Sequence, residues 1–114
     1  MPDTSAFPHE LAGLSRVIEI LRTIDSDMTV QAVAIFLAIC RREGITMKEL
    51  GIGLGIAQSS VSRNVAALSD KARRDRPALG LVAAEEDPDD WRRKIVRLTP
   101  RGRQVRAQLA EPLR

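Results

Sequence analysis

The stretch QSSVSRN, residues 58–64, gathers short polar side chains around a single arginine. If the stretch is helical, Ser59 and Arg63 point directly away from the apolar side that Val61 and Val65 define, because each residue turns a helix by about 100°. Serine hydroxyls can hydrogen-bond phosphates and base edges, and an arginine can donate two hydrogen bonds to one guanine. The pattern therefore predicts a helix that enters the major groove of DNA. Its candidate DNA contacts are Gln58, Ser59, Ser60, Ser62, Arg63 and Asn64.

An ordinary solvated helix offers a second interpretation of the serines. Exposed helix positions usually carry Glu and Lys, which have good helix propensity and form stabilising pairs four residues apart. Three serines add little to helix stability, so a purely structural interpretation treats them as a weak first turn. We favour the groove interpretation because a short helix and a glycine turn precede the stretch, as a two-helix DNA-binding motif requires.

Basic side chains are concentrated toward the carboxyl end of the sequence. Lys and Arg exceed Asp and Glu by only 18 to 15, but residues 92–106 contain seven basic residues and no acidic one. An acidic run, EEDPDD, lies just before them at residues 85–90. A segregated basic segment suits the negatively charged backbone of nucleic acid. The candidate phosphate contacts are Arg92, Arg93 and Lys94.

The sequence offers little that could serve catalysis. Its only histidine, His9, lies near the amino terminus, and it has no Cys/His cluster, glycine-rich phosphate loop or serine elbow. The carboxylates of residues 85–90 lack the spacing of a calcium-binding loop, so we expect no metal and no cofactor. The single cysteine, Cys40, is interpreted as a small buried apolar side chain. We therefore expect that the protein is not an enzyme.

The length and the apolar content suit one small domain. A chain of 114 residues is long enough for a single core and too short for two ordinary ones. No apolar run approaches the roughly 18 residues of a membrane span. The first ten residues, MPDTSAFPHE, lack the basic start and apolar centre of a secretory signal. We expect a cytoplasmic protein without a membrane partner.

The pattern of residues 46–70 predicts a helix-turn-helix. Thr46 and Glu49 have the spacing of a capping box, which begins a short helix that ends about Gly53, with Gly55 beyond it. A second helix is predicted over residues 58–69. Its apolar face comprises Ala57, Val61, Val65 and Leu68.

Two further helices are predicted before this motif. Residues 9–25 place apolar side chains three and four residues apart, so this amphipathic helix can pack within its own domain or against a second subunit. Residues 30–40, VQAVAIFLAIC, are almost wholly apolar, which predicts a helix in the middle of the core with Thr29 or Asp27 as its cap. The stripe of the first helix comprises Leu11, Leu14, Ile18 and Leu21, with Val17 and Ile24 beside it.

The stretch KIVRLTPRG, residues 94–102, predicts a strand that leads directly into a helix. Apolar and basic side chains alternate at its start, as in a half-buried strand. Thr99 can cap the next helix, and Pro100 fits the first helical position, where no amide donor is needed. We therefore expect a last helix over residues 100–111.

Three segments in this order, TMKELGIGLGIAQSSVSRNVAALSDKA, GLV and DDWRRKIVRLTPRG, resemble the winged helix-turn-helix of MarR-type transcriptional regulators over about half the chain. The resemblance implies a fold that is mainly α with a small β-hairpin wing, in a single domain over residues 1–114. It implies that residues 58–64 enter the major groove, that residues 80–98 form the wing and that two subunits read a near-palindromic site. Members of this family mostly repress transcription, and many release DNA when they bind a small molecule.

Three features depart from the family pattern. The hinge at residues 71–79 is longer than usual, so its basic side chains either grip phosphates or belong to a solvated connector. The acidic tip at residues 85–90 would be repelled by phosphates, which leaves only its carboxyl-terminal side suited to DNA. Trp91 is predicted to be a packed aromatic that steadies the hairpin rather than a DNA wedge, with Asp90 and Arg92 pairing across the turn. The basic residues of the hinge are Lys71, Arg73, Arg74 and Arg76.

The sequence as a whole predicts a regulator of transcription that binds double-stranded DNA sequence-specifically. The predicted form is a homodimeric repressor that inserts the helix over residues 58–69 into the major groove. The alternative is a winged-helix protein-interaction module without sequence-specific DNA binding, which would use the acidic wing and the stripe of the first helix. Neither prediction identifies a small-molecule effector.

Overall fold

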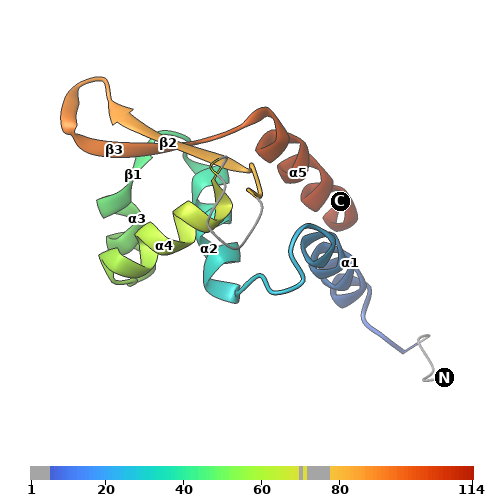
Figure 1. Cartoon of the computed structure of the whole chain (residues 1–114). Helices are drawn as coiled ribbons and strands as arrows, with labels where there is room; N and C mark the ends of the chain where they lie inside the picture. The colour runs from blue at the N-terminus through green and yellow to red at the C-terminus, as the bar shows by residue number, and fades with distance from the viewer. Residues whose placement is uncertain (1–5, 70, 72–77) are drawn as a thin grey trace.

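In the computed structural model, which describes residues 6–69, 71 and 78–114, the chain forms five α-helices and three strands. The helix-turn-helix and the turn of the β-hairpin lie toward one end of the molecule, and the first and last helices lie at the other (Figure 1). The molecule is elongated, with extents of 55 × 29 × 26 Å. The elements are α1 (His9–Ile24), α2 (Val30–Arg41), β1 (Ile45–Thr46), α3 (Met47–Leu54), α4 (Gln58–Leu68), β2 (Val82–Asp87), β3 (Asp90–Leu98), α5 (Pro100–Ala110) and a short 3₁₀ helix, η1 (Glu111–Leu113).

The strands form an antiparallel sheet in the order β1-β3-β2. The hairpin of β2 and β3 is the predicted wing, and Val82 pairs with Leu98 at its base. β1 joins the other side of β3, where Ile45 pairs with Val96. The predicted fold class, mainly α with a small β-hairpin wing, is confirmed. The third strand was not predicted because two residues are too few to show an alternating pattern.

The hydrophobic core lies between α2, α4 and the base of the hairpin. α2 supplies Ile35, Phe36 and Ile39, all without exposed surface, so this apolar helix occupies the middle of the core. The apolar face of α4 is buried as predicted for Val61, Val65 and Leu68. Ala57 was wrongly assigned to that face: it is the exposed N-cap residue, because the chain has not yet turned into the helix there.

Two side-chain caps fix where α2 and α3 begin. The hydroxyl of Thr29 accepts a hydrogen bond from the amide of Ala32 at 3.0 Å. Thr46 and Glu49 form the predicted capping box, in which each side chain accepts a hydrogen bond from the other residue's amide, at 3.0 and 3.1 Å. The prediction that α3 ends at about Gly53 is off by one residue, because Gly53 is still helical. The helix ends one residue later, before Gly55, which adopts the left-handed conformation at φ +67°.

The turn between α3 and α4 is tight because the two helices approach at Gly51. A Cβ atom at this position would meet the side-chain amide of Gln58 and would lie 2.9 Å from the carbonyl oxygen of Ile56. Only glycine fits between the two helices without displacing them.

The strand β3 passes directly into α5 through Thr99. The Thr99 hydroxyl accepts a hydrogen bond from the amide of Gly102 at 3.0 Å and donates one to the carbonyl of Gly80 at 2.5 Å. Pro100 occupies the first helical position, as predicted. Gly102 packs its backbone against the carbonyl of Leu81, where a Cβ atom could not fit. The sequence TPRG therefore fastens the start of α5 to the chain that enters the hairpin.

Glu43, in the connection before β1, ties the end of β3 to α5. Its carboxylate accepts a hydrogen bond from the amide of Leu98 at 3.0 Å and another from Arg103 at 3.0 Å, and Arg106 lies 3.9 Å away. Desolvation alone would raise the pKa of Glu43, but the hydrogen bonds from Arg103 and Leu98 and the two nearby positive charges outweigh it and lower this pKa.

The first helix is only partly covered by the rest of the chain. Leu21 is buried, but Leu11, Leu14 and Ile18 remain 44–49% exposed. α1 rests on η1 at Gly13, where an added Cβ atom would lie 2.7 Å from the carbonyl oxygen of Pro112. The predicted apolar stripe is therefore present and largely open to solvent.

Candidate nucleic-acid interface

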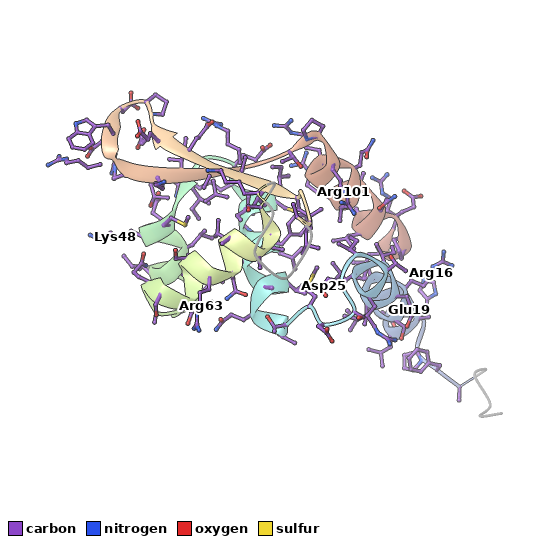
Figure 2. All side chains as sticks on the ribbon, viewed as in Figure 1. Arg16, Glu19, Asp25, Lys48, Arg63 and Arg101 are labelled. Atoms are coloured by element: carbon purple, nitrogen blue, oxygen red, sulfur yellow. The ribbon has the colours of Figure 1, made fainter. Side chains whose placement is uncertain are left out.

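The outer side of α4 carries three exposed polar side chains, those of Ser59, Ser62 and Arg63. Arg63 extends from this side to the outside of the molecule (Figure 2). Its guanidinium donates a hydrogen bond of 3.2 Å to the hydroxyl of Ser60, one turn earlier. The apolar side of the same helix is buried, so these groups lie on the only side of α4 that can face a partner.

The two amide side chains of the predicted set also contact the protein. Asn64 is half-buried and donates hydrogen bonds to the side-chain oxygen of Gln31 at 2.9 Å and to the carbonyl of Ser60 at 2.8 Å. Gln58 is exposed, and its side-chain nitrogen lies 3.5 Å from the carbonyl of Met47. Asn64 therefore fixes α4 on α2, and Gln58 reaches toward α3. Gln31 was not predicted at this surface because its partner is 33 residues away in the sequence.

At the tip of the wing the strand register shifts. Glu86 pairs with Lys94, but the next pair is Asp87 with Asp90. The intervening residues of β3, Trp91 to Arg93, therefore have no cross-strand partners and form a bulge at the end of the hairpin.

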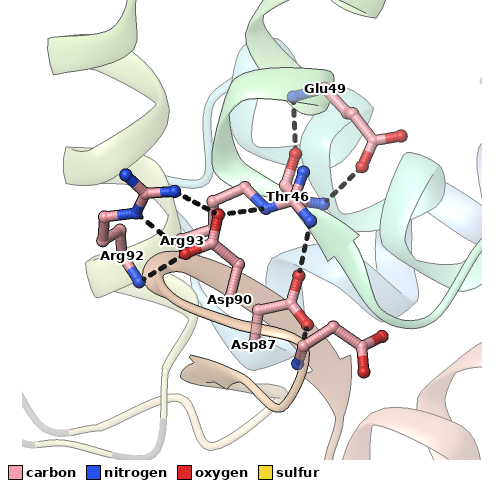
Figure 3. A network of polar contacts seen from close by, with 7 residues as sticks. Thr46, Glu49, Asp87, Asp90, Arg92 and Arg93 are labelled. Carbon is pink, nitrogen blue, oxygen red and sulfur yellow. Dashed lines mark hydrogen bonds and ion pairs between the residues drawn. The ribbon is translucent and has the colours of Figure 1, made fainter.

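Arginines pair with two carboxylates of the acidic tip, those of Asp87 and Asp90 (Figure 3). Asp90 and Arg92 form the predicted pair, with a nitrogen–oxygen distance of 3.1 Å, and Arg93 lies 3.2 Å from Asp87 and 3.7 Å from Asp90. The hydrogen bonds from Arg92, together with the charge of Arg93, lower the pKa of Asp90. The basic side chains proposed for phosphate contact thus already hold carboxylates, except for Lys94, which is exposed and takes part in none of these pairs.

Trp91 does not pack, and the prediction that it steadies the hairpin is wrong. Its side chain is 75% exposed. The bulge places it at the end of the hairpin, which projects beyond the helices, so no helix can cover it (Figure 1).

The long hinge leaves and rejoins the fold at one point. The amide of Gly80 donates to the carbonyl of Ser69, and the amide of Leu81 donates to the carbonyl of Leu68, both at 2.9 Å. Lys71 is exposed. The other basic residues predicted there are Arg73, Arg74 and Arg76, which lie outside the described residues. Whether the hinge contacts phosphates or is a solvated connector therefore stays a prediction.

A polar hollow of about 490 Å³ lies between the wing and the start of α3. Its arginines are already paired: Arg42 lies 2.7 Å from Glu49, and Arg97 lies 2.7 Å from Glu85. The pKa of Glu49 is lowered, chiefly by the hydrogen bond from the Thr46 amide and further by Arg42. In the described part of the chain, no three His, Cys, Asp or Glu residues are grouped so that they could hold a metal ion.

Two further predictions concern Cys40 and the membrane. Cys40 is half-buried, and burial raises the pKa of its thiol to about 11, which suits an unreactive packing residue. Among the described helices, none is both long and apolar enough to cross a membrane.

Comparison with known proteins confirms the resemblance to MarR-type regulators. A model of the MarR family matches residues 26–72, the segment that contains α2, α3 and α4. No curated protein sequence matches the chain.

Several solved structures share the fold. The transcriptional regulator Tm0710 from Thermotoga maritima has a TM-score of 0.69 and 24% identity, over 92% of this chain and 64% of that one. The PcaV regulator from Streptomyces coelicolor, solved with its natural ligand, has a TM-score of 0.63 and 23% identity, over 99% of this chain and 77% of that one. Reduced AbfR bound to DNA has a TM-score of 0.64 and 17% identity, over 90% of this chain and 68% of that one. At these identities, the likeness establishes the winged helix-turn-helix fold.

Proposed function

We propose that this chain is a transcriptional regulator of MarR type, which binds double-stranded DNA by inserting α4 into the major groove. The observation that carries the proposal is the exposed polar side of α4, formed by Ser59, Ser62 and Arg63 on a helix whose other side is buried. The match of the MarR family model to α2, α3 and α4 supports it, and so does the likeness to a structure solved with DNA.

Each side chain of this surface has a distinct task. Arg63 donates two hydrogen bonds to a guanine, after it gives up its contact with Ser60. Ser59 and Ser62 meet base edges, because their short side chains let the helix backbone approach the groove. Ser60, freed from Arg63, and Gln58 contact bases or phosphates, and Asn64 holds the helix at the correct angle.

The basic residues of the wing contact the DNA backbone beside the major groove. Lys94 is exposed and takes part in none of the ion pairs of the tip, so it reaches a phosphate without breaking one. Arg92 and Arg93 must exchange a carboxylate for a phosphate. Phosphate contacts of this kind add affinity for all sequences and do not select among them.

The active species is a homodimer that represses transcription. The open stripe of Leu11, Leu14 and Ile18 supplies an apolar surface that a second copy can cover. A symmetric pair would place its two α4 helices in successive major grooves, about 34 Å apart, and would read a near-palindromic operator. A dimer bound over a promoter excludes the polymerase.

Selection of bound fragments from a random duplex library tests this function. The retained fragments should share a palindromic motif, and a mobility shift at two salt concentrations should show them retained over competitor DNA. Uniform retention of all duplexes, or none, would favour the alternative, a winged-helix module that binds other proteins.

A further inference from the structure

Trp91 is a large aromatic side chain left open at the tip of the wing. It is 75% exposed, whereas the side chains of Asp87 and Asp90 beside it are only 12% and 25% exposed, because they turn toward arginines. The tip therefore presents an indole outward and keeps two of its carboxylates inward. Trp buries much apolar surface when it meets a partner, and it is enriched at interfaces.

The chemistry of indole matches the minor groove of A·T-rich DNA. Indole has apolar faces and one N–H donor, and it has no acceptor. The minor groove of A·T pairs presents only acceptors, adenine N3 and thymine O2, whereas a G·C pair adds the guanine amino group, which is a donor and fills the groove. Apolar wedges also enter the minor groove at easily unstacked steps. An indole thus favours A·T pairs, because its one polar group is a donor that matches their acceptors and it meets no guanine amino group there.

The position of Trp91 fits this partner. The turn of the hairpin and the start of α4 lie at the same end of the molecule, away from α1 and α5 (Figure 1). A duplex that receives α4 in its major groove therefore continues toward the wing. The charge of the tip is close to balanced, because four basic side chains, those of Arg92, Arg93, Lys94 and Arg97, accompany the five carboxylates of residues 85–90.

We infer that Trp91 is a specificity-determining residue, which packs its indole into the minor groove beside the half-site and selects A·T pairs there. The inference rests on the proposed function and adds a second determinant of sequence to it. Trp91 is neutral, so it changes which flanking sequence is bound without changing how binding responds to salt.

Fluorescence tests this inference directly, because Trp91 is the only tryptophan and the chain has no tyrosine. The probe is a duplex retained in the selection described above. Its binding should shift the Trp91 emission to shorter wavelength or quench it. Unchanged emission, while a mobility shift on the same mixture shows the duplex bound, would overturn the inference and leave the proposed function standing. If no duplex is retained, the proposed function fails and this inference fails with it.

Base substitution in the flank identifies the groove that is read. Replacing the flanking A·T pairs by G·C should weaken binding about tenfold, and inosine·C pairs, which lack the minor-groove amino group, should restore it. Trp91→Ala should bind the parent duplex about tenfold more weakly and should no longer distinguish the flanks, with an unchanged salt slope. Phe7→Ala, another exposed aromatic at the far end of the chain, serves as the control. Binding of Trp91→Ala within twofold of the parent, or no recovery with inosine, would overturn the inference.

Discussion

The side chain of Asn64 on α4 donates a hydrogen bond of 2.9 Å to that of Gln31 on α2, although 33 residues separate them. Asn64 also donates to the carbonyl of Ser60, within its own helix. The bond to Gln31 fixes the rotation of α4 about its axis, together with the burial of its apolar side, and the bond to Ser60 holds the Asn64 side chain in place. The rotation directs Ser59 and Arg63 outward, and the predictions on DNA binding depend on it.

Arg63→Ala should weaken binding to the selected operator by about 1 to 3 kcal/mol for each half-site and relax the preference at one base pair of each, because a bidentate contact to guanine is lost. Binding titrations with the operator and with single-base variants measure both effects. Arg16→Ala, an exposed arginine on α1 at the other end of the molecule, should leave both unchanged (Figure 2). An Arg63→Ala protein with full sequence preference would rule out the assigned contact.

Lys94→Ala should weaken binding to all duplexes alike and make the negative slope of log affinity against log salt shallower by about 0.9 for the phosphate contact that each subunit loses, or about 1.8 for the dimer. Arg93→Ala should change the slope less, because Asp87 and Asp90 already balance the Arg93 charge. Affinities measured at several salt concentrations give the two slopes. Equal slopes in the two variants would show that Arg93 gives up no ion pair when it meets a phosphate.

Gly51→Ala should destabilise the fold by about 2 kcal/mol, because the new methyl group meets the Gln58 side chain and the Ile56 carbonyl. Gly53→Ala is the matched control in the same helix. No atom lies within 4 Å of a Cβ at Gly53, so alanine should stabilise the protein by about 0.5 kcal/mol through helix propensity. Urea unfolding followed by circular dichroism measures both. The same sign of effect at both positions would contradict the tight turn.

Glu43→Gln should lower the free energy of unfolding at neutral pH by about 1 kcal/mol, since the pairs with Arg103 and Arg106 are lost. The pKa of Glu43 is lower in the folded chain than its ordinary value of 4.5, so the carboxylate stabilises the fold above that pH. The advantage of the parent over the variant should shrink as the pH falls below 4.5 through the folded pKa. Urea unfolding of both proteins between pH 7 and about pH 3 tests this. A difference independent of pH would show that the charge of Glu43 is not responsible.

Ile18→Glu should raise the dissociation constant of the dimer more than about tenfold, because a carboxylate would be buried between two α1 helices. Ile18 is 45% exposed in the single chain, so the fold itself should persist, which circular dichroism would show. Sedimentation equilibrium measures the association. Arg16→Glu adds the same carboxylate off the apolar stripe and should leave the dimer intact. A parent protein that is monomeric at all concentrations would refute the proposed assembly.

Local patterns were sufficient to predict the helix starts and the strand-to-helix passage. The capping box of Thr46 and Glu49, and the cap that Thr99 forms before Pro100, depend on groups three residues apart, so their spacing is visible in the sequence. The periodic burial of α4 was visible for the same reason. The outward positions of Ser59 and Arg63 followed from that period alone.

Contacts between distant segments could not be predicted. The register shift that exposes Trp91 depends on how β2 and β3 pair, which no single strand records. The bond between Gln31 and Asn64 depends on the packing of α2 against α4. Gly53 and Gly55 are both glycines in one short stretch, and the sequence does not show that Gly55 is the one that adopts the left-handed conformation where the helix ends.

The contact of Gly102 with the Leu81 backbone packs the start of α5 directly against the chain that enters β2. β3 enters α5 without a flexible joint, and η1, which follows α5, rests on α1 at Gly13. The helical end and the hairpin are thus joined by a continuous run of packed backbone, from α1 through η1 and α5 to β3.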